Sequence, residues 1–208
     1  MTDLISELAG IEPGSPVDSA FGNRAEARAN AEASYRLLVE PDDPRAVSLT
    51  ERRAVAAFVA ALHHEEATRQ HYRGLIEADN RATATAVLLA ASEALANGEP
   101  GPWGSYPSGP LSDENVPGTP FRVGVAHRRT LGPRLTAAVE HAHLLVFHPR
   151  DASRAALQAL LDAGWTTDGI VTLSQLVAFL TFQIRVVAGL RAVADARATR
   201  DADTAIPA

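Results

Sequence analysis

The fold is decided by the stretch from Leu157 to Leu190, which reads LQALLDAGWTTDGIVTLSQLVAFLTFQIRVVAGL. Gly164 ends a first helix within it, because glycine readily adopts the left-handed geometry that terminates helices. A second helix is predicted from about Thr167 to about Ala198. Its apolar residues are Ile170, Leu173, Val177, Leu180, Ile184 and Val187 on one face, and Phe179, Phe182 and Val186 on others. A helix that is apolar on most sides is buried, so the sequence predicts a core made of helices.

The segments before this stretch complete an all-α helical bundle. Apolar periodicity and capping residues predict four further helices and the start of the first helix named above. They cover about 24–39, 51–78, 81–96, 133–147 and 152–163, with Thr50 and Asp151 as N-caps and Asn97 with Gly98 as a C-cap. The segment 51–78 contains no glycine or proline before Gly74, so it is predicted as one long helix with any break near that end.

One long loop and two terminal segments lie outside these helices. Proline and glycine recur too often for a helix between Glu99 and Gly132, and Trp103, Tyr106 and Phe121 are spread through the same segment. Loops of this length are usually functional or disordered, and the aromatic residues favour a segment that packs onto something. We expect an N-terminal arm at 1–22, a single helical domain at 23–198 with the loop 99–132 inserted, and a disordered tail at 199–208.

The composition limits the chemistry of the chain. It has 208 residues, 46% of them hydrophobic, which suffices for one domain with its own core. Cysteine is absent and Met1 is the only methionine, so no internal side chain can undergo thiol or thioether redox cycling. A redox role would need a borrowed cofactor, and we predict none.

Charge and hydropathy argue against two classes of partner. The net charge is -6, and the basic residues are arginines scattered among acidic neighbours, so we expect no binding to nucleic acid. Gln175, Gln183 and Arg185 interrupt the longest apolar run, which leaves no stretch of about 18 uninterrupted apolar residues for a membrane span. The N-terminus lacks the pattern of a secretion signal. We therefore expect a cytoplasmic protein.

One face of the predicted helix 51–78 carries polar groups within an apolar seam. Spacings of four and three residues place on it Ala54, Phe58, Ala61, Glu65, Thr68, Tyr72 and Leu75. If the seam is buried, Glu65, Thr68 and Tyr72 need partners, because an unpaired buried polar group is costly. Glu65 is therefore a candidate acid or base. The alternative is that Glu65 pairs with Arg185 or another arginine and only fixes helix packing.

The histidines do not predict a metal site. His64 and His71 are two helical turns apart, roughly 10 Å of rise, whereas ligand pairs on a helix usually lie one turn apart. His141 and His143 are two residues apart on a predicted helix and point to different faces, so they cannot chelate jointly without other ligands. His148, before Pro149, is predicted as an exposed helix end.

Two stretches resemble the carboxymuconolactone decarboxylase and alkylhydroperoxidase D superfamily. Residues 157–190 are similar to the closing helices of its peroxidase-related members. The matching residues are Ala163, Gly164, Asp168, Phe179, Phe182, Arg185, Gly189 and Leu190. The second stretch, SLTERRAVAAFVAALHHEEATRQHYRGLIEA at 48–78, resembles the catalytic helix of the superfamily. Together they cover about a third of the chain.

The resemblance implies that the thiol site of the superfamily is missing here. Active peroxidase members carry a CxxC motif on the catalytic helix, followed by one or two histidines. Alignment places Glu65 and Thr68 at the cysteine positions, and His71 and Tyr72 at the histidine positions. Neither a carboxylate nor a hydroxyl can replace sulfur in thiol–disulfide exchange, so this peroxidase chemistry is excluded.

Three functions stay open on this resemblance. The first is a non-redox acid–base enzyme acting on a small carboxylated substrate, with Glu65, Thr68, His71, Tyr72 and His64 as catalytic residues. Arg185, Arg128 or Arg129 would hold the substrate carboxylate by a bidentate contact. The second is a catalytically silent paralogue that assembles with an active alkylhydroperoxidase-like protein. The third is a small-molecule binding protein whose aromatic loop covers a pocket between subunits.

The resemblance also implies the assembly state. Members commonly form trimers or hexamers through helices of this kind, so we expect a homo-oligomer. No metal ion or cofactor is expected in it.

Overall fold

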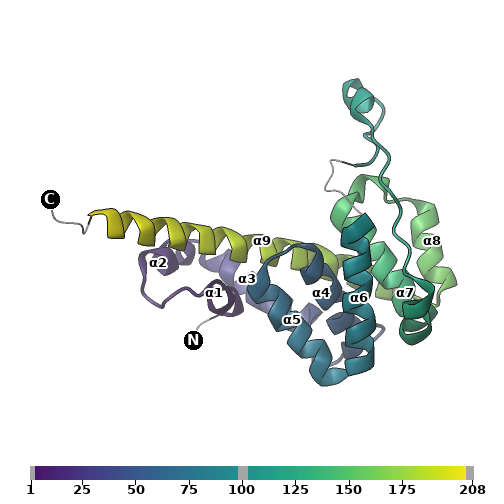
Figure 1. Cartoon of the computed structure of the whole chain (residues 1–208), viewed down its shortest axis with the longest axis horizontal. Helices are drawn as coiled ribbons and strands as arrows, with labels where there is room; N and C mark the ends of the chain where they lie inside the picture. Colours follow the sequence, from purple (N-terminus) through teal and green to yellow (C-terminus); the bar gives the residue numbers. More distant parts are fainter. Residues whose placement is uncertain (1–2, 98–102, 205–208) are drawn as a thin grey trace.

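The chain folds as an all-α helical bundle, which confirms the predicted fold class (Figure 1). The computed structural model describes residues 3–97 and 103–204. Within these two ranges the only β-type pairing is an isolated bridge between Gly104 and Val116 in the long loop.

The helices have the following bounds. The first three are α1 (Leu4–Ala9), α2 (Pro16–Gly22) and α3 (Ala25–Leu38). They are followed by α4 (Leu49–Leu62), α5 (Glu66–Asp79) and α6 (Arg81–Asn97). The remainder consists of the short 3-10 helix η1 (Pro110–Glu114), α7 (Val125–Phe147), the 3-10 helix η2 (Pro149–Asp151), α8 (Arg154–Asp162) and α9 (Thr167–Thr204).

Helix α4 forms the centre of the bundle, because it contacts α5, α6, α7 and α9. The whole run from Ala54 to Ala60 is buried, so neighbours cover every face of this helix. The small alanine side chains in the run allow those neighbours to pack closely. Phe58 also reaches Phe121 of the long loop, with 6.0 Å between the ring centroids. The end of the loop therefore belongs to the core.

Helix α9 crosses two apolar clusters, which confirms the predicted burial of one face, whereas Phe182 is 48% exposed. Leu173, Leu176, Val177, Leu180 and Ile184 are buried in the large cluster around α4. Farther along, Val187 belongs to a smaller cluster with residues of α1, α2 and α3. The helix continues to Thr204, beyond the predicted end near Ala198, so 199–204 are helical and not part of a tail. Residues 205–208 lie outside the described part of the chain.

By length and mean hydropathy, α9 is also long and apolar enough to cross a membrane between Thr167 and Arg200. Gln175, Gln183 and Arg185 interrupt the apolar run without removing this property. Half of the most apolar window is buried inside the structure, against α4, α7, α1 and α3. A central bundle helix needs such an apolar surface whether or not a membrane is involved.

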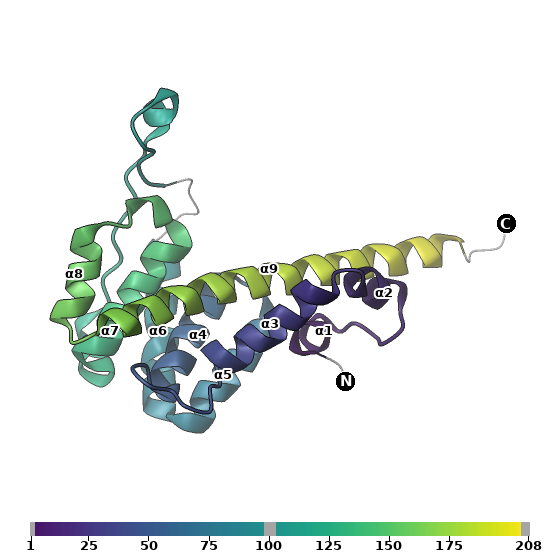
Figure 2. The same ribbon diagram turned by 180° about the vertical axis from the view of Figure 1, so that it is seen from behind.

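The N-terminal arm packs on its own chain (Figure 2). Its two short helices, α1 and α2, lie against α9 and bury Ile5, Ala9 and Val17 there. Arg28 of α3 adds polar ties, because its guanidinium pairs with Asp3 and, at 2.8 Å, with Asp18. The arm is therefore fixed to α3 and α9 of the same molecule.

The predicted helix 51–78 is in fact two helices, so this prediction is wrong. Helix α4 ends at Leu62 and α5 begins at Glu66. Between them His64 adopts a left-handed conformation with φ 57°. The Glu65 carboxylate then accepts the free N–H groups of Ala67 and Thr68 at the start of α5, which offsets the interrupted helical hydrogen bonds. No glycine or proline marks this break.

Two predicted N-caps are also wrong, although each lies within two residues of the correct one. Ser48, not Thr50, caps α4 through a reciprocal capping box with Glu51. Ser153, not Asp151, caps α8, because its hydroxyl accepts the N–H of Ala156. Serine, threonine and aspartate all cap helices well, so local sequence does not distinguish such neighbours.

The long loop is shorter than predicted. Residues 125–131 are helical and form the first turns of α7, and Gly132, with φ 70°, produces a kink before Pro133. Only glycine adopts that φ without strain, which explains why the helix bends at this residue. The segment around η1 extends away from the bundle (Figure 1), whereas Phe121 and Val123 are buried in the core. The predicted C-cap residue Gly98 lies outside the described residues.

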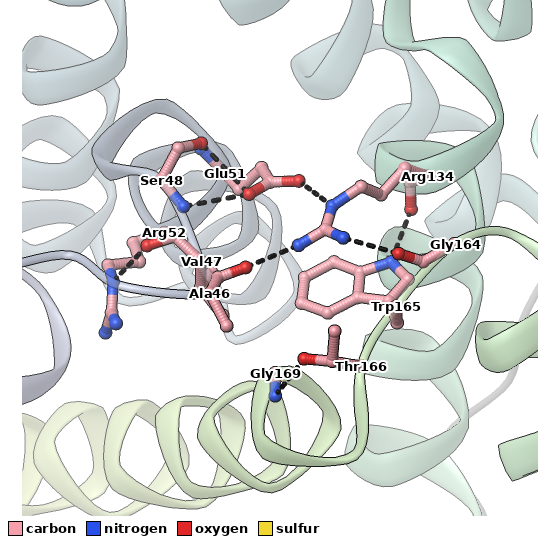
Figure 3. Close-up of polar contacts among 10 residues, drawn as sticks. All are labelled: Ala46, Val47, Ser48, Glu51, Arg52, Arg134, Gly164, Trp165, Thr166 and Gly169. Carbon is pink, nitrogen blue, oxygen red and sulfur yellow. Dashed lines mark hydrogen bonds and ion pairs between the residues drawn. The ribbon is translucent and has the colours of Figure 1, made fainter.

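Arg134 of α7 fastens three segments together (Figure 3). Its guanidinium pairs with the carboxylate of Glu51 and donates to the carbonyls of Ala46, at 2.6 Å, and Gly164, at 2.7 Å. The ring of Trp165 lies 4.3 Å from the guanidinium carbon, and its indole N–H donates to the Arg134 carbonyl at 2.9 Å. Arg134 therefore joins α7 to the start of α4 and to the turn before α9.

Arg52 secures the segment between α3 and α4. Its side chain is buried and donates to the carbonyls of Val47 at 2.9 Å, Leu38 at 2.7 Å and Pro44 at 3.1 Å. Leu38 is the last residue of α3, where the helix dipole places partial negative charge. A buried arginine thus satisfies carbonyls that neither helix can pair.

Candidate functional site

Four of the residues predicted from the sequence, Glu65, Thr68, His71 and Tyr72, lie at the start and along the first half of α5. The Glu65 side chain is 9% exposed. Its carboxylate accepts the N–H of Thr68 at 2.7 Å and lies 3.4 Å from the guanidinium of Arg191 on α9. Glu65 lies outside both helices, so the helical spacing that predicted its position does not apply. In this geometry Glu65 caps α5, and its arginine partner is Arg191 instead of Arg185.

Thr68 and Tyr72 are fully buried. The Thr68 hydroxyl donates to the Glu65 carbonyl at 3.1 Å, and the Tyr72 hydroxyl donates to the side-chain carbonyl of Gln183. The amide nitrogen of Gln183 has no hydrogen-bond partner in the described part of the chain. Burial raises the pKa of Tyr72 well above its usual value, so the phenol stays protonated and acts as a donor.

His71 lies beside Tyr72, with its ring edge-on at 4.9 Å between centroids. Its Nε2 is 3.0 Å from the hydroxyl of Tyr35 on α3. Burial lowers the pKa of His71 and raises the pKa of Tyr35, so both groups are neutral near pH 7. Their contact is therefore a hydrogen bond between neutral groups that links α3 to α5.

These groups pair with one another or with residues of α3 and α9, and they leave little room for a substrate. Thr68 and Tyr72 have no exposed surface, and the cavities described below are lined by other residues. A ligand cannot reach Tyr72 in this arrangement of the helices. The geometry thus supports a packing role for the cluster, and its catalytic role stays a prediction.

The remaining predicted residues lie apart from this cluster. His64 is exposed and lines a cavity of about 620 Å³ between α5 and α6. Arg185 and Arg129 are exposed, whereas Arg128 donates to the Val123 carbonyl at 2.7 Å and to Glu140 at 3.1 Å. In the described part of the chain none of these three arginines has a hydrogen bond or ion pair with Glu65.

Replacing Glu65 by alanine is expected to lower the free energy of unfolding by about 1 kcal/mol, because α5 loses its N-cap. Glu65→Gln keeps an oxygen that can accept the same N–H groups and should lose less than half as much. Urea denaturation followed by circular dichroism measures both values. Equal stability of Glu65→Ala and the parent chain would contradict the capping role.

A cavity that we did not predict from the sequence lies between α7 and α8, and we call it the α7–α8 pocket. It has a volume of about 460 Å³, and the loop segment 117–122 forms one side. Its apolar lining consists of Phe121, Ala137, Leu144, Ala155, Ala156, Ala159 and Leu160. Its polar lining consists of Arg122, Glu140, His141, His148, Asp151 and Ser153. An apolar wall with a few polar groups is typical of small-ligand sites.

Two histidines of this pocket have ring nitrogens without hydrogen bonds. His141 and His148 are 6% and 4% exposed. Nε2 of His141 and both ring nitrogens of His148 lack a hydrogen-bond partner among the described residues. Nδ1 of His148 is 3.2 Å from the Asp151 carboxylate, which makes an ion pair when the imidazole is protonated, although the two groups are not aligned as a hydrogen bond. Buried polar groups without partners are rare in native proteins.

Gly118 allows the loop to close against these histidines. Its N–H donates to the Asp151 carboxylate at 3.3 Å. A Cβ atom at this position would lie 2.7 Å from Cγ of His148, so a larger residue would displace the imidazole ring. Farther along the loop, the N–H of Val123 donates to Glu140 at 3.0 Å. The loop is thus anchored to both α7 and the η2 turn.

His143 lies behind the pocket, in the core. Its ring packs against Phe121, with 5.0 Å between centroids, and against Phe147, at 4.8 Å. The ring of His148 is 5.6 Å away. Burial, with a smaller contribution from His148, lowers the pKa of His143 to about 4. His143 is therefore neutral near pH 7.

The sequence contains a signal for this pocket in the run HAHLLVFH at 141–148. His141 and His143 do point to different sides, since only His141 lines the pocket and His143 stacks on Phe121. The prediction that His148 is exposed is wrong, because residues 117–122 cover it. That contact joins segments far apart in the sequence, so helical spacing around His148 cannot reveal it.

We expect the free energy of unfolding to fall as the pH is lowered from about 6.5 to about 4. Burial lowers the pKa of His63 and of His143 from 6.5 to about 4, so between these values the unfolded chain binds protons that the folded chain does not. Each group contributes at most about 1.4 kcal/mol per pH unit. Their contribution is fully present above pH 6.5 and lost toward pH 4.

Urea denaturation at several pH values measures this loss. His143→Phe should make the pH dependence less steep, because it removes one of the buried histidines while keeping a ring between Phe121 and Phe147. A stability that is constant between pH 7 and pH 4.5 would contradict the prediction.

Comparison with known proteins adds no relative. No protein-family model matches the chain, and no curated protein or solved structure matches it significantly. The resemblance to the carboxymuconolactone decarboxylase and alkylhydroperoxidase D superfamily therefore rests on the residues quoted above and stays a prediction.

Proposed function

We propose that this protein binds a small molecule in the α7–α8 pocket. The observation that carries the proposal is a cavity of about 460 Å³ whose apolar wall holds buried imidazoles without hydrogen-bond partners. A bound molecule would fill the cavity, and it would supply the missing partners once the imidazole rings turn toward it, because the unpaired nitrogens are buried in the present arrangement. This is the third function that the sequence leaves open, with the loop covering a pocket inside one chain instead of between subunits.

The size of the pocket limits the ligand. At roughly 30 Å³ for each water-sized group, the cavity accommodates on the order of 15 non-hydrogen atoms. One substituted ring fits this volume, whereas a dinucleotide or a haem does not. Ala155, Ala156 and Ala159 place short side chains on the pocket side of α8, beside Leu160, which provides an apolar wall for such a ring.

A direct test is nuclear magnetic resonance titration of the ¹⁵N-labelled protein with single-ring probes. We expect p-cresol or indole to shift the amide signals of residues around the pocket, such as Leu144 and Ala156. Ala156→Phe should abolish these shifts, because the added ring occupies the cavity. The matched control is Leu157→Phe, whose side chain is on the same helix but exposed and outside the pocket lining.

The outcome of this titration decides the proposal. Circular dichroism verifies that both variants are folded as the parent is. If no single-ring probe shifts signals around the pocket at millimolar concentration, the binding function is contradicted. If Ala156→Phe and Leu157→Phe weaken binding equally, the probe binds elsewhere and the assignment to this pocket is wrong.

The assembly state is proposed on the resemblance alone. A trimer or hexamer, or a complex with an alkylhydroperoxidase-like protein, would bury part of the exposed surface of α9. Light scattering coupled to size-exclusion chromatography measures the mass directly, and a monomer at high concentration would contradict the homo-oligomer.

A further inference from the structure

The charged groups around the α7–α8 pocket are already paired. Glu140 accepts hydrogen bonds from Arg122 at 2.8 Å, from Arg128 at 3.1 Å and from the N–H of Val123 at 3.0 Å. Asp151 accepts the N–H of Gly118 and lies 3.2 Å from His148. A charged ligand would therefore find no free counter-ion among these groups.

The charges of the side chains that line the pocket disfavour an anion in particular. Two carboxylates, of Glu140 and Asp151, line the pocket, against one guanidinium, of Arg122. Like charges at short range destabilise each other in a partly buried site. A small carboxylated molecule, which the family resemblance suggests as a substrate, is therefore a poor match for this pocket.

The groups that lack partners are the imidazoles. Burial lowers the pKa of His141, so its ring is neutral near pH 7 and has one N–H donor and one lone pair. A hydroxyl group can both donate and accept hydrogen bonds, which matches a pair of imidazoles. A purely apolar ligand would leave these nitrogens without partners, and binding would lose the benefit of satisfying them.

We infer that the ligand of the α7–α8 pocket is a small uncharged ring compound with a hydroxyl group, a phenol or cyclic alcohol, which hydrogen-bonds to His141 and His148. The apolar part of the ring lies between the alanines of α8 and the side chains of Phe121 and Leu144. This inference rests on the proposed binding function and adds the chemical class of the ligand.

The test compares probes of equal shape. p-Cresol and p-xylene differ only in a hydroxyl against a methyl group, and 4-methylbenzoate and 4-methylbenzylamine add a negative or a positive charge. The dissociation constant of each is measured by titration of the ¹⁵N-labelled protein at pH 7. We expect p-cresol to bind about tenfold to hundredfold more tightly than p-xylene, and at least about tenfold more tightly than either charged probe.

Variants assign this preference to the two histidines. His141→Phe and His148→Phe should each reduce the ratio of the p-xylene to the p-cresol dissociation constant to nearly one, while p-xylene still binds. A general change in the shape of the pocket affects the binding of both probes, so it cancels in this ratio. His141→Gln and His148→Gln keep donor and acceptor atoms and should retain a preference for p-cresol, which supplies a second comparison if a phenylalanine variant does not fold.

Each outcome has a defined meaning. Equal binding of p-cresol and p-xylene to the parent chain would overturn the inference while leaving the binding function intact. Tighter binding of 4-methylbenzoate or 4-methylbenzylamine would overturn it in the same way and identify a charged ligand. If no probe binds in the pocket, the proposed function itself fails, and the inference with it.

Discussion

Replacing Arg52 by methionine is expected to lower the free energy of unfolding by about 3 kcal/mol, one of the largest effects of any single change in this chain. The buried guanidinium donates to the carbonyls of Leu38, Pro44 and Val47. Methionine keeps most of the apolar stem but has no donor, so the carbonyls of Leu38 and Val47 lose their partner, whereas the Pro44 carbonyl keeps the N–H of Val47. Each buried acceptor without a partner costs about 1–3 kcal/mol.

Guanidinium chloride denaturation measures the loss, and Arg69→Met is the matched control. Arg69 forms an exposed ion pair with Glu66 one turn away. Exposed pairs of this kind contribute about 0.3–0.5 kcal/mol, so the control should change little. A loss below about 1 kcal/mol for Arg52→Met would show that water replaces the guanidinium at these carbonyls.

Replacing Arg134 by methionine is expected to cost about 2–4 kcal/mol, because charge-assisted hydrogen bonds are worth more than neutral ones. The change breaks the ion pair with Glu51 and the bonds to the carbonyls of Ala46 and Gly164 (Figure 3). It also removes the cation from the face of Trp165. The side chain is 31% exposed, so water compensates part of the loss.

A double-mutant cycle that combines Arg134→Met with Glu51→Gln tests the ion pair between these two residues. The combined loss should be smaller than the sum of the two single losses, because both changes remove the same ion pair. Strict additivity would contradict the contact between Arg134 and Glu51. Arg134→Lys should recover only a part of the stability, since lysine cannot make several hydrogen bonds in fixed directions.

Helical periodicity predicted the fold class well because the signal is local. The apolar faces of α9 and the limits of α3 and α6 follow from residues close together in the sequence. The break at His64 did not follow, since no glycine or proline marks it and the Glu65 cap competes with helix continuation by a small free energy. Neighbouring capping residues, such as Ser48 and Thr50, differ too little in capping free energy for the sequence to show which of them caps the helix.

In the candidate sites, too, features set by neighbouring residues could be predicted, whereas contacts between distant segments could not. The burial of Thr68 and Tyr72 agrees with the expected seam, because the two residues are one turn apart on α5. The partners Gln183 and Arg191 come from α9, and nothing in the local sequence selects them over other polar residues there. The α7–α8 pocket depends on the contact of Gly118 with His148 and Asp151, which only the folded chain brings about.

The large separation in sequence between the arm and α9 affects how the protein is made. Val17 and Ala31 are covered by Val187 and its neighbours, and the ribosome adds Val187 156 residues after Ala31. At roughly 5–20 residues per second, the arm waits on the order of 10–30 s for this cover during translation. Throughout that time the apolar side of the arm lacks its cover from α9 and faces the surroundings of the nascent chain.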